Sequence, residues 1–165
     1  AAAPDKTIYF TEASIGTWNY DFGKCLVNDF ASIFLGTLNR WGRGVTLWNL
    51  LLDEKGAPNR PKGCRTCYGA IEISSESYDY ASLVRKSHYY DIAHCSKVIA
   101  PGAVRLASAS ECGEAIVSAA FANPDGSYAL VAANLSESEQ CVEITGTGRY
   151  LTLTLPPRSI VSAKW

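Results

Sequence analysis

Short apolar runs and one helical pattern alternate through the first part of the chain. Thr7-Ile8-Tyr9-Phe10 is β-branched and aromatic, which predicts a short buried strand. Between positions 26 and 41 apolar residues recur at steps of three and four, which predicts an amphipathic helix closed by Gly42 and Gly44. Val45 to Leu52 is almost continuously apolar, as in a strand covered on both faces. The predicted apolar face of the helix consists of Leu26, Val27, Phe30, Ile33, Phe34, Leu38 and Trp41.

A long loop, a short strand and a second helix are predicted next. The Gly, Pro and Asn residues of Asp53 to Tyr68 predict the loop, Ala70 to Ile73 the strand, and Arg85 to Val98 the helix. Strand, helix, strand, helix with short links is the repeating unit of a parallel α/β barrel or a doubly wound sheet. Two such units are present, whereas a full barrel needs eight.

The pattern changes near Pro101-Gly102, where we place a boundary between domains 1–100 and 101–165. Beyond it no helical period appears, and short β-patterned runs follow one another with turn residues between them. Asn123-Pro124-Asp125-Gly126 is a strong hairpin signal. From 151 to 155 leucine alternates with threonine, which predicts a strand with one buried face. Six antiparallel strands predict a β-sandwich: Val104–Ser108, Ala115–Phe121, Tyr128–Ala133, Cys141–Ile144, Tyr150–Leu155 and Ser159–Lys164.

The composition narrows the class of protein. Hydrophobic residues make up 47% of 165 residues and the formal net charge is −1, so the chain can bury a core and has no electrostatic reason to bind nucleic acid or an anionic membrane. No apolar run is long enough to predict a membrane span. Six Cys fit an exported protein with some disulfides, although 15 pairings are possible. Because the chain contains no Met, we expect a processed, trimmed or excised piece.

Two short motifs carry candidate chemistry. Glu12, in Thr11-Glu12-Ala13-Ser14, directly follows the first predicted strand, and the active sites of α/β barrels lie at the carboxyl ends of the strands. Trp48 and Asn49 interrupt an apolar strand, which is costly unless they face a cavity where the indole N–H and the amide find partners. An aromatic ring beside an amide suits a sugar. The alternatives are a surface loop acid at position 12 and a core tryptophan at position 48.

These motifs, taken in order, resemble glycoside hydrolase family 30, the family of lysosomal glucosylceramidase and of bacterial and fungal β-1,6-glucanases and β-xylosidases. Each motif is short, but the series is specific and runs from about Thr7 to Trp165. The motifs are Tyr9-Phe10-Thr11-Glu12-Ala13-Ser14, Trp48-Asn49-Leu50, Gly56-Ala57-Pro58-Asn59, His88-Tyr89-Tyr90 with His94-Cys95-Ser96-Lys97, and Leu155-Pro156-Pro157-Arg158-Ser159-Ile160.

The resemblance implies the last two βα units of a (β/α)8 TIM barrel followed by an antiparallel β-sandwich. Thr7–Phe10 would be the seventh barrel strand and Val45–Leu52 the eighth. The implied reaction is hydrolysis of a β-linked glycan or glycoside with retention, in which Glu12 is the nucleophile and Trp48 lines the sugar pocket. This chemistry requires no metal or organic cofactor. The other candidate substrate-binding residues are Ser14, Trp18 and Asn49.

The family's acid/base is a Glu that follows Asn on the fourth barrel strand, and this chain contains no Asn-Glu dipeptide. General acid catalysis contributes about 10²–10⁴-fold, so we expect the isolated chain to be inactive or nearly so. The missing N-terminal part of the barrel would come from the same gene or from another chain. Without it we expect aggregation or dimerisation, because two barrel strands leave unpaired edges. The expected location is secreted, periplasmic or extracellular, or lysosomal in an animal.

Other interpretations stay open at this point. The sandwich could be a non-catalytic module that binds a carbohydrate or supports another domain. Cys64-Arg65-Thr66-Cys67 supplies half of a zinc site, and a local disulfide or two thiols is favoured over metal. His88 and His94 lie six apart on a predicted helix and are interpreted as structural. Lesser candidates are a bridge between Cys112 and Cys141, N-glycosylation at Asn134-Leu135-Ser136, and Trp18 with Tyr20 as either a sugar subsite or packing against helices.

Overall fold

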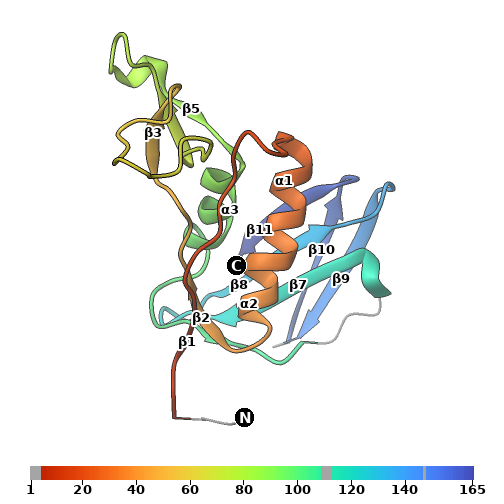
Figure 1. Cartoon of the computed structure of the whole chain (residues 1–165). Helices are drawn as coiled ribbons and strands as arrows, with labels where there is room; N and C mark the ends of the chain where they lie inside the picture. Colours follow the sequence, from red (N-terminus) through yellow and green to blue (C-terminus); the bar gives the residue numbers. More distant parts are fainter. Residues whose placement is uncertain (1–4, 109–112, 147) are drawn as a thin grey trace.

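A four-stranded antiparallel sheet with the order β11-β8-β7-β6 lies at the centre of the molecule (Figure 1). The computed structural model describes residues 5–108, 113–146 and 148–165. The tight turn between β7 and β8 is the one predicted, and Gly126 adopts the positive φ of 83° that this turn requires. The strands are β6 (Val104–Arg105), β7 (Ile116–Ala122), β8 (Tyr128–Asn134) and β11 (Ser159–Lys164).

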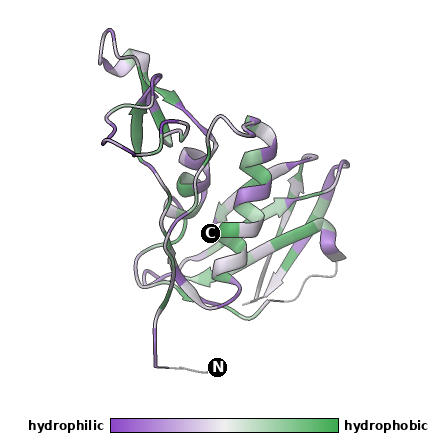
Figure 2. Cartoon of the chain, in the orientation of Figure 1, coloured by the Kyte–Doolittle hydropathy of each residue, from purple (hydrophilic) through white to green (hydrophobic). Residues whose placement is uncertain are grey.

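Both faces of this sheet are covered. On one face, Val131 and other buried residues of β7, β8 and β11 pack against Phe30 and Phe34 of the long helix. On the other face, Leu130 and Ala132 pack against the separate two-stranded sheet of β9 (Gln140–Gly146) and β10 (Arg149–Leu155). Figure 2 shows the apolar colour concentrated along the central strands between these two layers. The β9–β10 pair and the central sheet form the predicted β-sandwich.

The long helix runs through three consecutive segments: α1 (Phe22–Asp29), the π-helical η1 (Phe30–Leu35) and α2 (Gly36–Leu38). Asp21 caps its N-terminus by accepting a hydrogen bond from a first-turn amide. Phe30 is fully buried, as the apolar periodicity predicts. Trp41 is a correction: the helix ends three residues earlier, and a φ of 68° turns the chain so that the Trp41 side chain is 72% exposed. Gly42 begins the next strand and does not close the helix.

The predicted run Val45–Leu52 is two strands rather than one. β2 (Gly42–Val45) pairs in parallel with β1 (Ile8–Phe10), and β3 (Leu51–Asp53) pairs in parallel with β4 (Ile71–Ile73). The intervening backbone contains a cis peptide bond between Trp48 and Asn49. The predicted burial of the first strand is also a correction, because Ile8 and Tyr9 are exposed. In the described chain β1 pairs with β2 alone, so its other edge has no neighbouring strand.

A small three-stranded sheet of β3, β4 and β5 (Val84–Arg85) projects from the body of the molecule at the upper left of Figure 1. The 3₁₀ turn η2 (Tyr80–Ser82) precedes β5. α3 (Ser87–Ser96) follows it and packs against α1, which confirms a second helix within the predicted range Arg85–Val98.

All six predicted sandwich strands are present, with boundaries that differ by a few residues. The short 3₁₀ turn η3 (Gly113–Ala115) leads into β7. Asn134, the candidate glycosylation acceptor, is a correction because its side chain is completely buried. Its Nδ2 donates hydrogen bonds to the carbonyl oxygens of Ser138, Leu155 and Pro156 at 2.8–3.1 Å. The folded chain therefore offers no amide nitrogen at this position for a glycan.

Candidate functional site

Glu12 and Trp48 follow the carboxyl ends of two neighbouring parallel strands. Beyond β1 and β2 the two segments stay paired: the amide of Thr46 donates to the carbonyl of Phe10 at 2.9 Å, and the amide of Trp48 donates to the carbonyl of Ala13 at 2.7 Å. Glu12 therefore lies between two anchored residues on the segment beside Trp48. Both side chains reach the surface, and the Trp48 ring is 45% exposed. The segments that carry Glu12 and Trp48 are thus paired through their backbones, and the functional roles of the two side chains stay a prediction.

Ser14 continues this pairing, since it forms a parallel bridge with Trp48. Asn49 has a structural role besides its place next to Trp48. Its Oδ1 accepts a hydrogen bond from the amide of Leu51 at 3.1 Å, and its carbonyl accepts one from the amide of Ala70 at 2.7 Å. These bonds fix the backbone between β2 and β3 and thereby hold the loop that carries the indole.

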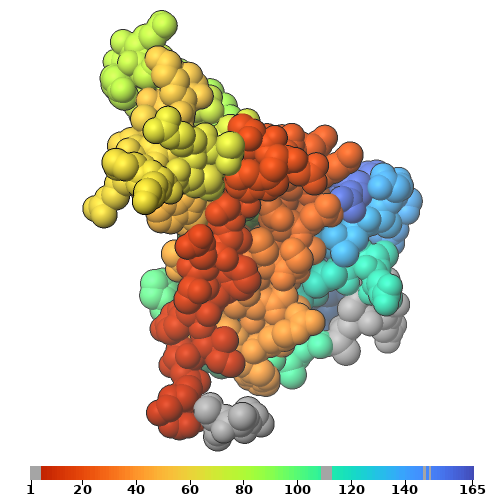
Figure 3. All heavy atoms as spheres, viewed as in Figure 1, coloured from red at the N-terminus to blue at the C-terminus, as the bar shows by residue number. Residues whose placement is uncertain are grey.

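The segment after Ser14 runs beside the long loop of residues 54–70. The amide of Tyr68 donates to the carbonyl of Ile15, and the amide of Thr17 donates to the carbonyl of Thr66, both at 2.8 Å. Gly16 pairs with Cys67 at the centre of this contact. In Figure 3 the red N-terminal segment climbs the visible face and meets the yellow loop there. Sequence reasoning missed this contact, because it joins residues about fifty positions apart.

Trp18 and Tyr20, the two loop aromatics with alternative roles, lie in different surroundings. The Tyr20 hydroxyl accepts a hydrogen bond from the amide of Ser87 at the start of α3, at 3.1 Å, and its ring meets Tyr68 edge to face. Tyr20 is thus a packing residue. Trp18 is 56% exposed, and its ring lies over Gly16. Of the two, Trp18 is the one available to a ligand.

Both histidines and two of the cysteines have structural partners in the described part of the chain. Cys64 and Cys67 form a disulfide, as one of the favoured alternatives predicted. Cys141 carries a free thiol, whereas Cys112 lies outside the described residues. The Nε2 of His88 lies 3.2 Å from a carboxylate oxygen of Asp29, and His94 lies 3.1 Å from the hydroxyl of Ser162. Within residues 5–108, 113–146 and 148–165 no group of three or more His, Cys, Asp or Glu side chains is arranged to hold a metal ion.

A buried carboxyl group lies at the contact between α1 and α3, and sequence reasoning missed it. Asp91 is completely buried, and both of its carboxylate oxygens lack a hydrogen-bond partner among the described residues. Burial and the nearby charge of Asp29 raise the pKa of Asp91 to about 9. Burial likewise raises the pKa of Cys95 to about 12. The only sequence signal was an aspartate within the predicted helix Arg85–Val98.

Comparison with known proteins accounts for nearly the whole chain. Residues 102–163 match the family model described as glycosyl hydrolase family 30 beta sandwich domain. The solved structure of the endo-β1,6-glucanase BT3312 is 43% identical, with a TM-score of 0.93 over 99% of this chain and 36% of its own. The endo-1,6-β-D-glucanase BGN16.3 of Trichoderma harzianum is 27% identical over 96% of this chain and 31% of its length. The lysosomal acid glucosylceramidase of Mus musculus is 24% identical over 94% of this chain and 29% of its length.

The fold of this chain is shared with a solved endo-β1,6-glucanase, and its sequence is similar to those of other glycoside hydrolases. The chain belongs to glycoside hydrolase family 30. It spans about a third of the length of the relatives that it matches. None of the helices in the described ranges has the length and apolarity needed to cross a bilayer.

Proposed function

We propose that this chain is the C-terminal portion of a retaining β-glycoside hydrolase, with Glu12 as the nucleophile. The glycosidic oxygen is protonated by an acid while the Glu12 carboxylate bonds to the anomeric carbon, and water then hydrolyses this covalent intermediate. The observation that carries the proposal is the pairing of the Glu12 and Trp48 segments beyond β1 and β2. It puts a carboxylate and a partly exposed indole at the carboxyl edge of two parallel strands, where β/α barrels build their active sites.

In this proposal β1 and β2 are the last two strands of a (β/α)8 barrel. Parallel strands occur almost entirely in sheets whose faces are covered, yet Ile8 and Tyr9 of β1 are exposed. Additional barrel strands and helices would cover these residues and supply the acid/base carboxyl group, which has no Asn-Glu counterpart in the present sequence. Those elements belong either to the same gene or to another chain. Ser14, Trp18, Trp48 and Asn49 are the residues of this chain that we assign to sugar binding.

The substrate that we favour is a β-1,6-linked glucan. The 43% identical relative is an endo-β1,6-glucanase, and the fungal relative carries the same description. The Cys64–Cys67 disulfide agrees with a location outside the cytosol, where a polysaccharide substrate would be met. A glucosylceramide substrate is the alternative, because the mouse relative is a glucosylceramidase.

The non-catalytic module is the second candidate, and the packing argues against it. The sandwich sheet buries one of its faces against Phe30, Phe34 and Leu35, which lie before the predicted boundary at residue 101. A module cut at that boundary would expose this apolar face to water. The boundary itself stays a prediction.

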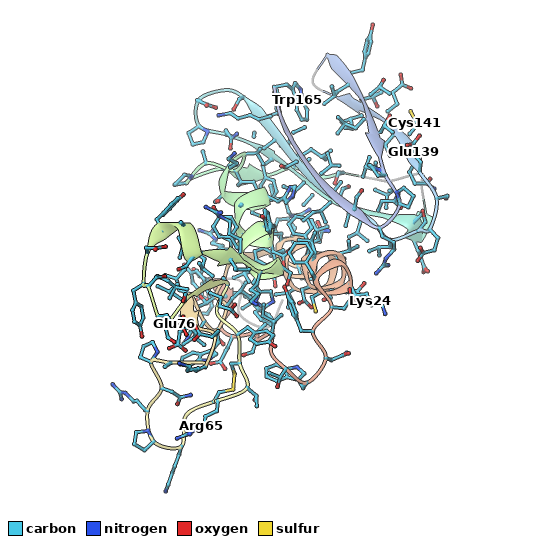
Figure 4. The ribbon with its side chains drawn as sticks, turned by 90° about the horizontal axis from the view of Figure 1, so that it is seen from above. Lys24, Arg65, Glu76, Glu139, Cys141 and Trp165 are labelled. Atoms are coloured by element: carbon cyan, nitrogen blue, oxygen red, sulfur yellow. A yellow bond between two sulfur atoms is a disulfide. The ribbon has the colours of Figure 1, made fainter. Side chains whose placement is uncertain are left out.

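The experiment is covalent labelling of the full-length protein with a mechanism-based 2-fluoroglycoside, followed by peptide mapping. We expect the label on Glu12, and we expect Glu12→Gln to lower kcat by at least about 10³-fold. Glu139→Gln is the matched control, because Glu139 is exposed and lies at the far end of the sandwich in Figure 4. Label on any other residue, or full activity of Glu12→Gln, would refute the assignment.

A further inference from the structure

The segment that follows Glu12 is held on two sides by different parts of the chain. On one side Ala13 and Ser14 pair with Trp48, as described above. On the other side the carbonyl of Ile15 and the amide of Thr17 are bonded to the turn that ends at Tyr68. The upstream anchor therefore fixes Glu12, whereas the downstream anchor fixes the backbone on which Trp18 is carried.

A disulfide closes the turn that forms the downstream anchor. The Cys64–Cys67 disulfide spans a four-residue turn, and Thr66, whose carbonyl accepts the bond from Thr17, lies inside that turn. Cys67 is buried, although the turn itself is exposed. The side-chain Nδ2 of Asn59 donates to the carbonyl of Cys64 and adds a second support.

The fit between turn and segment is close. Gly16 faces Cys67, and a Cβ atom at this position would collide with the carbonyl of Thr66 and with the ring of Trp18. No side chain can be placed there without separating the turn, the backbone and the indole. The position of the Trp18 ring is thus set by backbone that is itself held by the disulfide-closed turn.

We propose that the Cys64–Cys67 turn is a positioning element for sugar binding, which holds Trp18 in place without contributing to the orientation of Glu12. This inference rests on the proposed function. Opening the disulfide would loosen residues 15–18 and leave the pairing of Ala13 with Trp48 intact. Substrate binding would weaken, and the rate of the chemical step would not change.

The test is steady-state kinetics of the full-length protein on a β-1,6-glucan. We compare the oxidised protein, the protein reduced with dithiothreitol, and Cys64→Ser/Cys67→Ser. Reduction converts the disulfide to two thiols while dithiothreitol becomes a cyclic disulfide. We expect KM to rise about 2- to 10-fold in the last two forms, the range for freeing one ordered side chain, with kcat within about twofold. Reduction of the double variant should have no further effect.

Two further variants separate the explanations. Gly16→Ala should raise KM in the same way, because it displaces the turn without changing a cysteine. Cys141→Ser is the control, since this free, exposed thiol lies on β9 at the opposite end of the molecule from Arg65 in the disulfide turn (Figure 4). An unchanged KM, or a lower kcat at unchanged KM, overturns the proposal, because a purely structural role would only reduce the amount of active protein.

The outcome remains interpretable if the proposed function fails. Activity that survives Glu12→Gln would refute the nucleophile, whatever the disulfide does. Amide hydrogen exchange then tests the positioning step by itself. Reduction should remove the protection of the Thr17 and Tyr68 amides and preserve that of Trp48, and retained protection at all three would overturn the inference.

Discussion

The substitution Asp91→Asn tests whether a neutral carboxyl group is buried between α1 and α3. Asp91 is completely enclosed, and neither of its oxygens has a hydrogen-bond partner among the described residues. The groups that interact electrostatically with it are the carboxylate of Asp29 and the thiols of Cys25 and Cys95, and none of these is a cation. The imidazole of His88 lies 3.2 Å from Asp29. Asparagine has nearly the same shape and cannot ionise.

The magnitude follows from the displaced pKa. Asp91 has an ordinary pKa of 3.8 when unfolded and about 9 when folded, so it is protonated in the native state and ionised in the unfolded state throughout the range between these values. Folding then takes up a proton at Asp91, so the contribution of this group to stability is greatest below pH 3.8 and falls as the pH rises towards 9. The cost is about 1.4 kcal/mol for each pH unit. At pH 7 it reaches about 4 kcal/mol, an upper limit because local opening would hydrate the carboxylate.

The assay is urea unfolding of wild-type and Asp91→Asn protein at several pH values between 4 and 8. We expect nearly equal stability at pH 4 and a difference that grows with pH, with the variant more stable at pH 7. Asp125→Asn is the control, because hydrogen bonds from Ser127 and Lys164 lower the pKa of Asp125, so its contribution is lost only as the pH falls below 3.8 and its effect on stability should stay constant between pH 4 and 8. A difference between wild type and Asp91→Asn that does not change with pH would refute the reasoning.

Three further predictions concern the packing. Phe30→Ala should lower the unfolding free energy by about 3–5 kcal/mol in urea titrations, because Phe30 is fully buried against the sheet, and a loss below about 1 kcal/mol would contradict this. Asn134→Ala should cost about 2–3 kcal/mol, since it leaves buried carbonyls without a donor, and intact mass of protein from a glycosylating host should show no glycan at this position. The isolated chain should self-associate through the open edge of β1, and a monodisperse monomer in sedimentation would count against it.

Local patterns were sufficient for the elements of the sandwich and for the helix. Leucine alternates with threonine along β10, and Leu155 is buried while Thr154 is exposed, because a strand turns successive side chains to opposite faces. The helical face around Phe30 follows from the same kind of local geometry. The placement of Glu12 after a strand could also be predicted, because it depends on neighbouring residues alone.

The sequence by itself therefore determined the sandwich strands, the two helices and the two motifs that carry the candidate chemistry, although it predicted one strand at Val45–Leu52 where the structure has two. Only the tertiary structure decided what those segments meet: the exposure of Trp41, the burial of Asn134 and Asp91, and the contact of the Glu12 segment with the disulfide turn. The physical reason is the range of the interactions. Strand and helix periodicity is set by bonds within a few residues, whereas burial and hydrogen-bond partners depend on groups that lie far away in the sequence and are brought together only when the chain folds.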